Sequence, residues 1–315
     1  MRLKHVHLCP NVVVSTLCYG TLTLGPWQKG LTPEEGGRLL RYAMEQGVTF
    51  FDTAELYQTY DHIRHALKGW DKEVVIATKS YAVDEKDARR SLEKARREMD
   101  RDVIDIFMLH EQESDATLRG HARALEFLSR AKQAGIIRAV GISTHFISGV
   151  RAATNHPQID VIHPLINLTG LGIVDGSRDQ MASAILDAAQ ADKGIFAMKA
   201  LGGGSLFHRA EESLSYVRNL RGVHSVAVGM GCREDIDANV GFFADGYFPQ
   251  GLEQLDRERR LVIEPWCDGC SCCIAACANG ALSLDDSNMV VVDHSKCVLC
   301  SYCVPRCTYF NIKVV

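Results

Sequence analysis

The chain has 315 residues, a formal net charge of −4 and an ordinary mixture of apolar and charged residues. This length accommodates one large domain and a small one. The slightly acidic balance gives no electrostatic reason to expect nucleic acid or an anionic membrane as a partner. No stretch has the apolar length of a membrane span, and the first residues lack the apolar core of a secretory signal. We therefore expect a cytoplasmic protein.

Strands and helices are predicted to alternate along the chain. After a hairpin or strand entry within 5–19, a helix begins at Thr32, which precedes a proline and two acids, and it ends at Gly47. The predicted barrel strands are 12–17, 48–52, 73–79, 103–109, 136–143, 159–163, 194–199 and 223–228. The further helices are 59–68, 84–99, 116–134, one after His145, 178–191, 209–220 and 233–243.

This alternation over about 245 residues predicts an α/β protein, a closed (β/α)₈ TIM barrel. A doubly wound sheet is the main alternative, but no G-x-G-x-x-G follows the first strand. Polar residues stand where three successive strands end. Asp52 and Tyr57 follow one strand, Lys79 ends the next, and His110 ends the third. Barrel active sites lie at the carboxyl ends of the strands, so we expect these four side chains to share one mouth.

The four residue types support proton transfer to a reacting oxygen. Tyrosine has an ordinary pKa of about 10, and a nearby ammonium group lowers that pKa by stabilising the phenolate. A carboxylate keeps the lysine charged, and a neutral histidine can donate to a carbonyl oxygen. The set is a general acid aimed at an oxygen that gains charge as hydride reaches the carbon. Each residue alone is more often structural, but their combination favours catalysis.

Four stretches carry a resemblance to a known family: GVTFFDTAELY, VVIATKS, DVIDIFMLH and IRAVGIST. In order and spacing they resemble the aldo-keto reductases, over residues from about 5 to 245. The resemblance implies a (β/α)₈ barrel, NAD(P)H as hydride donor and a small-molecule substrate. It also implies a catalytic tetrad of Asp52, Tyr57, Lys79 and His110, with Tyr57 as the acid.

The same resemblance implies six cofactor contacts, several of which depart from the residue type that is usual in the family. They are Ser143, His163, Met198, Gly229, Arg233 and Asn239. Gly229 and Asp235 occupy slots that hold basic residues in many members. A glycine run, Gly202–Gly204, follows the seventh strand, where barrels often bind phosphate, and a plain flexible loop is the alternative interpretation.

Cysteine is the outlier of the composition, with twelve residues. Eight of them form two runs of C-x₂-C-x₂-C-x₃-C that begin at Cys267 and Cys297, so every position repeats after 30 residues. In a cytoplasmic chain such a cluster argues for metal rather than disulfides. Cys272 has no counterpart in the second run and is not a predicted ligand. The scattered cysteines are predicted to be small buried hydrophobes: Cys9, Cys18 and Cys232.

Three cysteines at this spacing can hold one iron–sulfur cubane, while the fourth reaches the other cluster. Residues 262–315 resemble the bacterial two-cluster ferredoxins, which implies a small α+β ferredoxin-like domain with two [4Fe–4S] clusters. Cluster one would use Cys267, Cys270, Cys273 and Cys307, and cluster two would use Cys297, Cys300, Cys303 and Cys277. The alternative is a pair of Cys₄ zinc sites, although zinc usually takes two well-separated C-x₂-C pairs.

These patterns divide the chain into a barrel at 1–245, a linker at 246–261 and the ferredoxin-like domain at 262–315. A barrel that moves hydride is thus joined to a module that moves single electrons. Direct coupling between the two needs a flavin or a substrate radical, and no flavin fingerprint is evident.

We carry three functional hypotheses. The favoured one is an oxidoreductase acting on a carbonyl, alcohol or related small molecule, with clusters that exchange electrons with a ferredoxin or another redox partner. The second is a plain NAD(P)H-dependent carbonyl reductase whose clusters are structural or sense oxygen. The third is a non-catalytic electron-carrier subunit on a barrel scaffold. Because accessible clusters tend to be oxidised, we expect the cytoplasm of an anaerobe.

Overall fold

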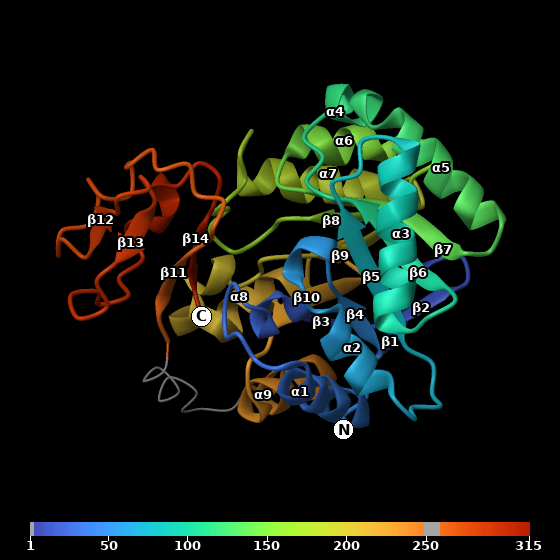
Figure 1. The fold of residues 1–315 in the computed structure, drawn as a ribbon, viewed down its shortest axis with the longest axis horizontal. Helices are drawn as coiled ribbons and strands as arrows, with labels where there is room; N and C mark the ends of the chain where they lie inside the picture. Colours follow the sequence, from blue (N-terminus) through green and yellow to red (C-terminus); the bar gives the residue numbers. More distant parts are fainter. Residues whose placement is uncertain (1–2, 249–258) are drawn as a thin grey trace.

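The computed structural model describes residues 3–248 and 259–315. Within them, parallel strands close into a barrel in the order β10-β3-β4-β5-β6-β7-β8-β9, which confirms the predicted (β/α)₈ barrel (Figure 1). The barrel strands are β3 (Leu17–Gly20), β4 (Phe50–Asp52), β5 (Val75–Ser80), β6 (Ile104–Leu109), β7 (Ile137–Thr144), β8 (Val161–Pro164), β9 (Gly194–Ala197) and β10 (Ser225–Gly229).

Helices surround the barrel on the outside. They are α1 (Pro33–Glu45), α2 (Tyr60–Leu67), α3 (Glu85–Met99), α4 (Asp115–Gly120), α5 (Ala122–Gln133), α6 (Ile147–Thr154), α7 (Arg178–Gln190), α8 (Ala210–Arg218) and α9 (Arg233–Asp245). Thr32 caps α1 as predicted, because its hydroxyl accepts the Glu35 N–H and the Glu35 carboxylate accepts the Thr32 N–H. The single helix expected at 116–134 is wrong: the chain breaks after Gly120 into α4 and α5.

The predicted first barrel strand at 12–17 is also wrong. Its first part is β2 (Val12–Ser15), which pairs antiparallel with β1 (His5–Cys9), and the barrel begins only at Leu17. The run VVVSTLCYG is almost entirely apolar or small, so hydropathy does not mark the break between the two strands. Val12 and Val14 are buried in the apolar core inside the barrel, so the hairpin closes the end opposite the mouth.

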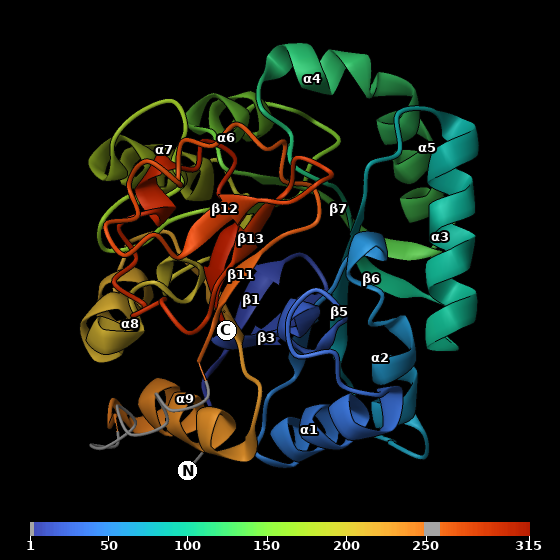
Figure 2. The same ribbon diagram turned by 60° about the vertical axis from the view of Figure 1, so that its left-hand side comes forward.

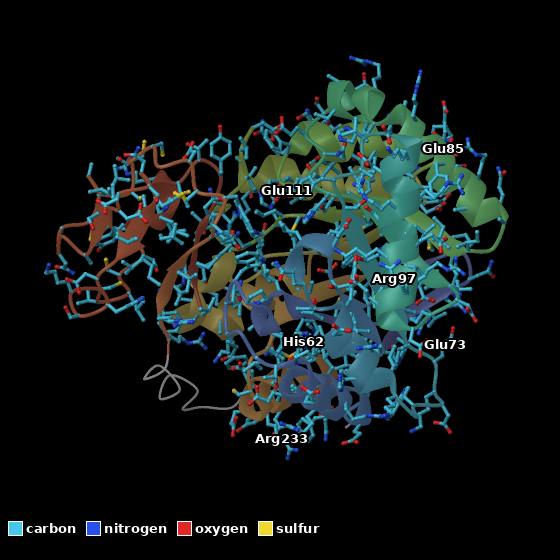
Figure 3. All side chains as sticks on the ribbon, viewed as in Figure 1. His62, Glu73, Glu85, Arg97, Glu111 and Arg233 are labelled. Carbon is cyan, nitrogen blue, oxygen red and sulfur yellow. The ribbon has the colours of Figure 1, made fainter. Side chains whose placement is uncertain are left out.

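Two apolar layers hold the barrel. One fills its interior, and a larger one lies between the strands and the surrounding helices. Charged side chains cover the outside, as Glu73, Glu85 and Arg97 show in Figure 3. Within the described residues, no helix combines the length and apolar character needed to span a membrane.

The C-terminal residues 259–315 form a segment that we call the cysteine segment. It contains β11 (Leu261–Ile263), β12 (Leu282–Leu284), β13 (Val290–Val292) and β14 (Ile312–Val314), with β11 antiparallel to β14 and β12 antiparallel to β13. Its one helical turn is of the 3-10 type, so the α component of the predicted α+β fold is not found in these residues. Residues 249–258 of the predicted linker lie outside the described residues.

The backbone of the cysteine segment repeats with the sequence. Left-handed conformations recur at three pairs of positions 30 residues apart: Gly269 and Leu299, Ser271 and Ser301, Gly280 and Phe310. β12 and β14 are offset by the same interval. The segment lies against the barrel, and Figure 2 shows it passing in front of the barrel strands. The interval seen in the cysteine spacing is therefore also a structural repeat.

Candidate active site

Neighbouring parallel strands bring three of the predicted residues to one rim. Asp52 ends β4, Lys79 lies near the end of β5, and His110 directly follows β6. The register pairs Asp52 with Ala77 and Lys79 with Met108, so Lys79 and His110 each lie two residues beyond the partner of the preceding site residue, on successive strands. A short 3-10 turn after β4, Glu55–Tyr57, carries Tyr57 over the same rim.

The four side chains contact one another. The Nζ of Lys79 lies 2.6 Å from Oδ1 of Asp52 and donates a second hydrogen bond, of 2.7 Å, to the Thr53 carbonyl oxygen. The same ammonium lies 4.9 Å from the centroid of the Tyr57 ring. The rings of Tyr57 and His110 meet edge to face, with centroids 5.8 Å apart. The structure thus brings together all four residues that the sequence singled out.

The protonation states follow from burial. Burial, with the charges of Asp52 and Glu111, raises the pKa of Tyr57 well above its ordinary value. This differs from the expected lowering by Lys79, because burial disfavours the charged phenolate and two carboxylates lie within range of the phenol as well. Burial and the Lys79 charge lower the pKa of His110 well below its usual range, so this imidazole is neutral as expected. The tetrad is a protonated phenol beside an uncharged imidazole and a compensated ion pair.

Two residues at the mouth were missed by the sequence reasoning. The Tyr81 ring stacks on His110 at 4.6 Å between centroids, and its hydroxyl donates a 2.7 Å hydrogen bond to Glu111. Both follow tetrad residues closely in sequence, two residues after Lys79 and one after His110. Proximity to a strand end was the available signal, but neither stretch has a distinctive motif.

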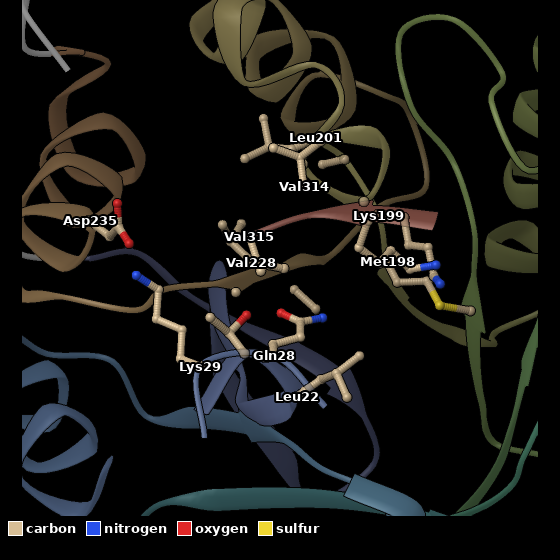
Figure 4. Close-up of a pocket in the computed structure, with 18 of the residues that line it drawn as sticks. Leu22, Gln28, Lys29, Met198, Lys199, Leu201, Val228, Asp235, Val314 and Val315 are labelled. Atoms are coloured by element: carbon tan, nitrogen blue, oxygen red, sulfur yellow. The ribbon is translucent and has the colours of Figure 1, made fainter. Parts of the chain in front are cut away.

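A cavity of about 480 Å³ opens at the mouth (Figure 4). Asp52 and Tyr57 line it, and it extends to Lys29 and Asp235. Its size lies within the range of small-molecule and cofactor sites. Figure 4 shows Met198 and Lys199 at one side and Lys29 and Asp235 at the other.

The structure divides the six predicted cofactor residues into two groups. His163, Met198 and Gly229 line the cavity. The other three have different neighbours in the structure: Ser143 accepts the backbone N–H of Glu111, Arg233 lies over the Tyr42 ring, and Asn239 donates to the Asp235 carbonyl oxygen. The cofactor role of all six stays a prediction.

The cysteine segment supplies part of the cavity wall. Arg259, Lys313, Val314 and Val315 line it from this segment. Gly203 and Gly204 face the same strand with positive φ, and a Cβ on Gly204 would collide with the carbonyl of Val314. The glycine run therefore permits close approach of β14, which neither interpretation of this run anticipated.

The assignment of the cysteines to two clusters stays a prediction, and the structure gives two observations on their surroundings. A second, smaller cavity is lined by four of them, Cys277, Cys297, Cys300 and Cys303, which are the cysteines assigned to cluster two. Burial raises the pKa of Cys273 to about 11, and Cys307, Cys267 and Cys270 add to the rise, while Cys273 itself adds to the raised pKa of Cys303. Sulfur atoms gather visibly in this segment in Figure 3.

Backbone amides reach the fourth sulfur of each run in the same way. The N–H of Ala281 donates to Sγ of Cys277, and the N–H of Asn311 donates to Sγ of Cys307, both at 3.2 Å. Across residues 3–248 and 259–315, no three His, Cys, Asp or Glu side chains converge tightly enough to hold a single metal ion. Four thiolates on one zinc would need to approach that ion to about 2.3 Å. Both the iron–sulfur and the zinc assignment of these cysteines therefore stay predictions.

Comparison with curated proteins finds distant relatives. Methylglyoxal reductase DkgA of Yersinia pestis is 26% identical over 187 residues, which cover 56% of this chain and 65% of that protein. Aldo-keto reductase YhdN of Bacillus subtilis (strain 168) is 28% identical over 175 residues, which cover 50% of this chain and 52% of that protein. The chain thus spans about two thirds or less of the length of these two relatives.

Solved structures agree in fold. A putative aldo-keto reductase from Pseudomonas aeruginosa has 25% sequence identity and a TM-score of 0.65, covering 76% of this chain and 94% of that one. The holo form of aldo-keto reductase AKR11C1 from Bacillus halodurans has 19% identity and a TM-score of 0.64, with 80% and 94% covered.

The family model of the aldo/keto reductases matches residues 16–225, which include the whole tetrad and exclude the cysteine segment. The match supports the prediction of an oxidoreductase. Because it covers more than half of the chain, and the barrel and strand-end residues agree with it, this protein belongs to the aldo/keto reductase family.

Proposed function

We propose that this chain reduces the carbonyl group of a small molecule, or oxidises the corresponding alcohol, in the cavity at the barrel mouth. The observation that carries the proposal is the position of Tyr57 beside the buried Lys79–Asp52 pair, at the wall of that cavity. Membership of the aldo/keto reductase family supports the same class of reaction.

Tyr57 is the general acid. Its raised pKa keeps the phenol protonated at neutral pH, so it can give a proton to a carbonyl oxygen on which negative charge develops. Lys79 stabilises the phenolate that remains, and Asp52 holds Lys79 in place. His110, uncharged and next to Tyr57, orients the carbonyl oxygen.

NAD(P)H supplies hydride when it is bound in this cavity. His163 fits the nicotinamide end: its Nδ1 lies 2.6 Å from the Phe196 carbonyl oxygen and must be the donor there. The Nε2 atom is then an acceptor for the N–H of a carboxamide. Met198, predicted to lie against the nicotinamide ring, lines the same cavity, as does Gly229 from the predicted adenosine end of the site.

The opposite end of the cavity favours NADH over NADPH. Glu234 and Asp235 line it at the start of α9. Carboxylates accept hydrogen bonds from ribose hydroxyls and repel a 2′-phosphate. Lys29 lies on the same side of the cavity, and Figure 4 shows its amino group directed toward the Asp235 carboxylate.

The cysteine segment, we propose, holds two [4Fe–4S] clusters, which supply single-electron transfer to or from a ferredoxin or another redox partner. The cavity between Cys277, Cys297, Cys300 and Cys303 supports this proposal, as do the paired N–H···S contacts. Such contacts tune the potential of a cluster. A flavin remains among the cofactors to test, since hydride and single-electron donors need a mediator.

A second candidate has its own support. β14 forms part of the wall of the catalytic cavity, so clusters that merely hold the cysteine segment in place would already serve a plain NAD(P)H-dependent reductase. In that case the cluster oxidation state has no influence on turnover.

The deciding experiment uses anaerobically purified protein. The broad visible absorption of the clusters and their EPR signals are followed as NADH and then NADPH are added, with and without carbonyl substrate and free flavin. Bleaching supports electron exchange between the barrel and the clusters. Reduction by dithionite alone, with normal carbonyl turnover, supports the second candidate. Protein without bound iron, prepared anaerobically, contradicts both cluster assignments.

A further inference from the structure

One cation of the catalytic cavity has no role in the chemistry described above. Lys199 lies just beyond β9, two residues after its last residue, with a positive φ of 60°, and its side chain lines the cavity beside Met198 (Figure 4). A lysine in the left-handed region is strained. The chain therefore holds this side chain in place at a cost in conformational energy.

The charges around Lys199 do not balance. Lys313, on β14, makes a buried ion pair of 3.0 Å with Glu264. Lys199 has no such partner: among the described residues, no carboxylate lies within ion-pair distance of its Nζ atom, which instead lies 4.9 Å from the Phe310 ring centroid. Burial and the charge of Lys313 lower the pKa of Lys199 to about 7. A desolvated cation beside a second lysine is stabilised by an incoming anion.

The cation lies on the catalytic side of the cavity. Asp52, Tyr57 and His163 line the same cavity as Lys199, and the charge of Lys199 adds to the lowering of the pKa of His110 and of His163. Glu234 and Asp235 also line the cavity, and Figure 4 shows Asp235 at the other side. An anionic group bound at Lys199 would therefore sit next to the place where the carbonyl meets Tyr57.

We propose that Lys199 binds the oxyanion of the substrate, a carboxylate or phosphate carried by the same small molecule as the reacting carbonyl. This inference rests on the proposed carbonyl chemistry and narrows its substrate class to oxo acids and phosphorylated carbonyl compounds. Lys313 adds positive potential from the cysteine segment, so this segment contributes to substrate recognition as well as to the cavity wall.

Two substrates of similar shape, one anionic and one neutral, test whether Lys199 recognises the charge of the substrate. Phenylglyoxylate and its amide, phenylglyoxylamide, present the same carbonyl with and without an anion. In the holoprotein, Lys199→Met is expected to raise KM for phenylglyoxylate about 10- to 100-fold. KM for the amide stays unchanged, and Lys199→Arg keeps most of the selectivity for the acid. Lys72→Met, at an exposed lysine beside Trp70, is the control and leaves both values unchanged.

A binding measurement needs no turnover. Oxamate is an unreactive oxo-acid analogue and oxamide is its neutral counterpart. Oxamate is expected to raise the Tm of the wild-type holoprotein but not that of Lys199→Met, while oxamide affects neither. If Lys199→Met weakens NADH binding and leaves the acid-to-amide ratio as it was, the cation serves the cofactor diphosphate and the inference is wrong. If the wild type reduces neither carbonyl probe, the proposed function fails, and oxamate binding alone decides the role of Lys199.

Discussion

The barrel and the cysteine segment are held together by different interactions. The barrel has a continuous apolar core between strands and helices and a second core inside the strands. The cysteine segment has only three-residue strands and one small apolar cluster, in which cysteines are prominent members. Cys273 and Cys303 are buried at its centre, whereas Cys270 and Cys300 are exposed.

This difference in apolar burial indicates that the cysteine segment, and not the barrel, needs a cofactor to fold. A segment this small gains little from apolar burial, so the proposed clusters would supply folding free energy to it. The barrel has no such requirement. Yet the two share the catalytic cavity, because β14 lies against the glycine run after β9. Loss of the clusters should therefore open the cavity while the barrel stays folded.

The largest effect is expected from Cys303→Ala, because it removes a buried ligand of cluster two. We expect loss of iron and visible absorption, and rapid proteolysis of the cysteine segment, with the cooperative unfolding of the barrel preserved. Iron and sulfide assays with limited proteolysis measure this. The matched control is Cys272→Ala, since Cys272 is exposed and has no counterpart in the repeat. Equal iron content in both variants would contradict the proposal that Cys303 is a cluster ligand and Cys272 is not.

Tyr57→Phe should affect the barrel chemistry alone. The variant lacks the acid, so carbonyl reduction is expected to fall about 10²- to 10⁴-fold in kcat. The iron content and the absorption of the clusters should stay as in the wild type. Tyr216→Phe, on α8 outside the cavity, serves as the control. A Tyr57→Phe protein with full turnover would assign the proton transfer to another group.

Lys79→Met tests the buried charge pair of the barrel. It leaves Asp52 buried without its partner, and we expect a loss of about 3–5 kcal/mol in the free energy of unfolding of the barrel. Adding Asp52→Asn should recover most of that loss, which denaturant titration measures. Arg64→Met breaks an exposed pair with Asp61 and should cost less than about 1 kcal/mol. If Lys79→Met and Arg64→Met lowered the free energy of unfolding by similar amounts, burial would not explain the importance of the Lys79–Asp52 pair.

The smallest effect is expected from Lys199→Met on stability. The folded-state pKa of about 7 lies below the ordinary value of 10.5, so the unfolded chain binds more protons between these values and stability rises with pH. The variant loses this dependence. It should be more stable than the wild type by about 1 kcal/mol near pH 7, an amount discounted for partial exposure, and equal to it above pH 10.5. Thermal melts at several pH values check the sign, and a variant less stable at pH 7 would contradict it.

Much of the site was predictable because its signals are local. Asp52, Lys79 and His110 each end an apolar strand, and parallel strands of a barrel place their ends on one rim. The cysteine runs were equally clear, since the spacing of thiolates in a loop is itself a local constraint. The Thr32 cap was found for the same reason.

Other features depend on contacts that are distant in sequence. The split between β2 and β3 arises because the hairpin packs into the barrel interior, and an apolar run does not reveal which partner it will take. The raised pKa of Tyr57 depends on burial and on the charges of Asp52 and Glu111, which the motif does not convey.

Sequence alone determined the strand–helix alternation, the tetrad and the repeat of cysteines, because each follows from the order of residues within one element or between neighbouring ones. Tertiary structure decided how the cysteine segment meets the barrel. The lysine of β14 lies 114 positions from Lys199 in the chain, and only folding places both at one cavity, where Lys313 pairs with Glu264. Charge balance in a buried site is a property of all the elements that surround it, so no single stretch of sequence can reveal it.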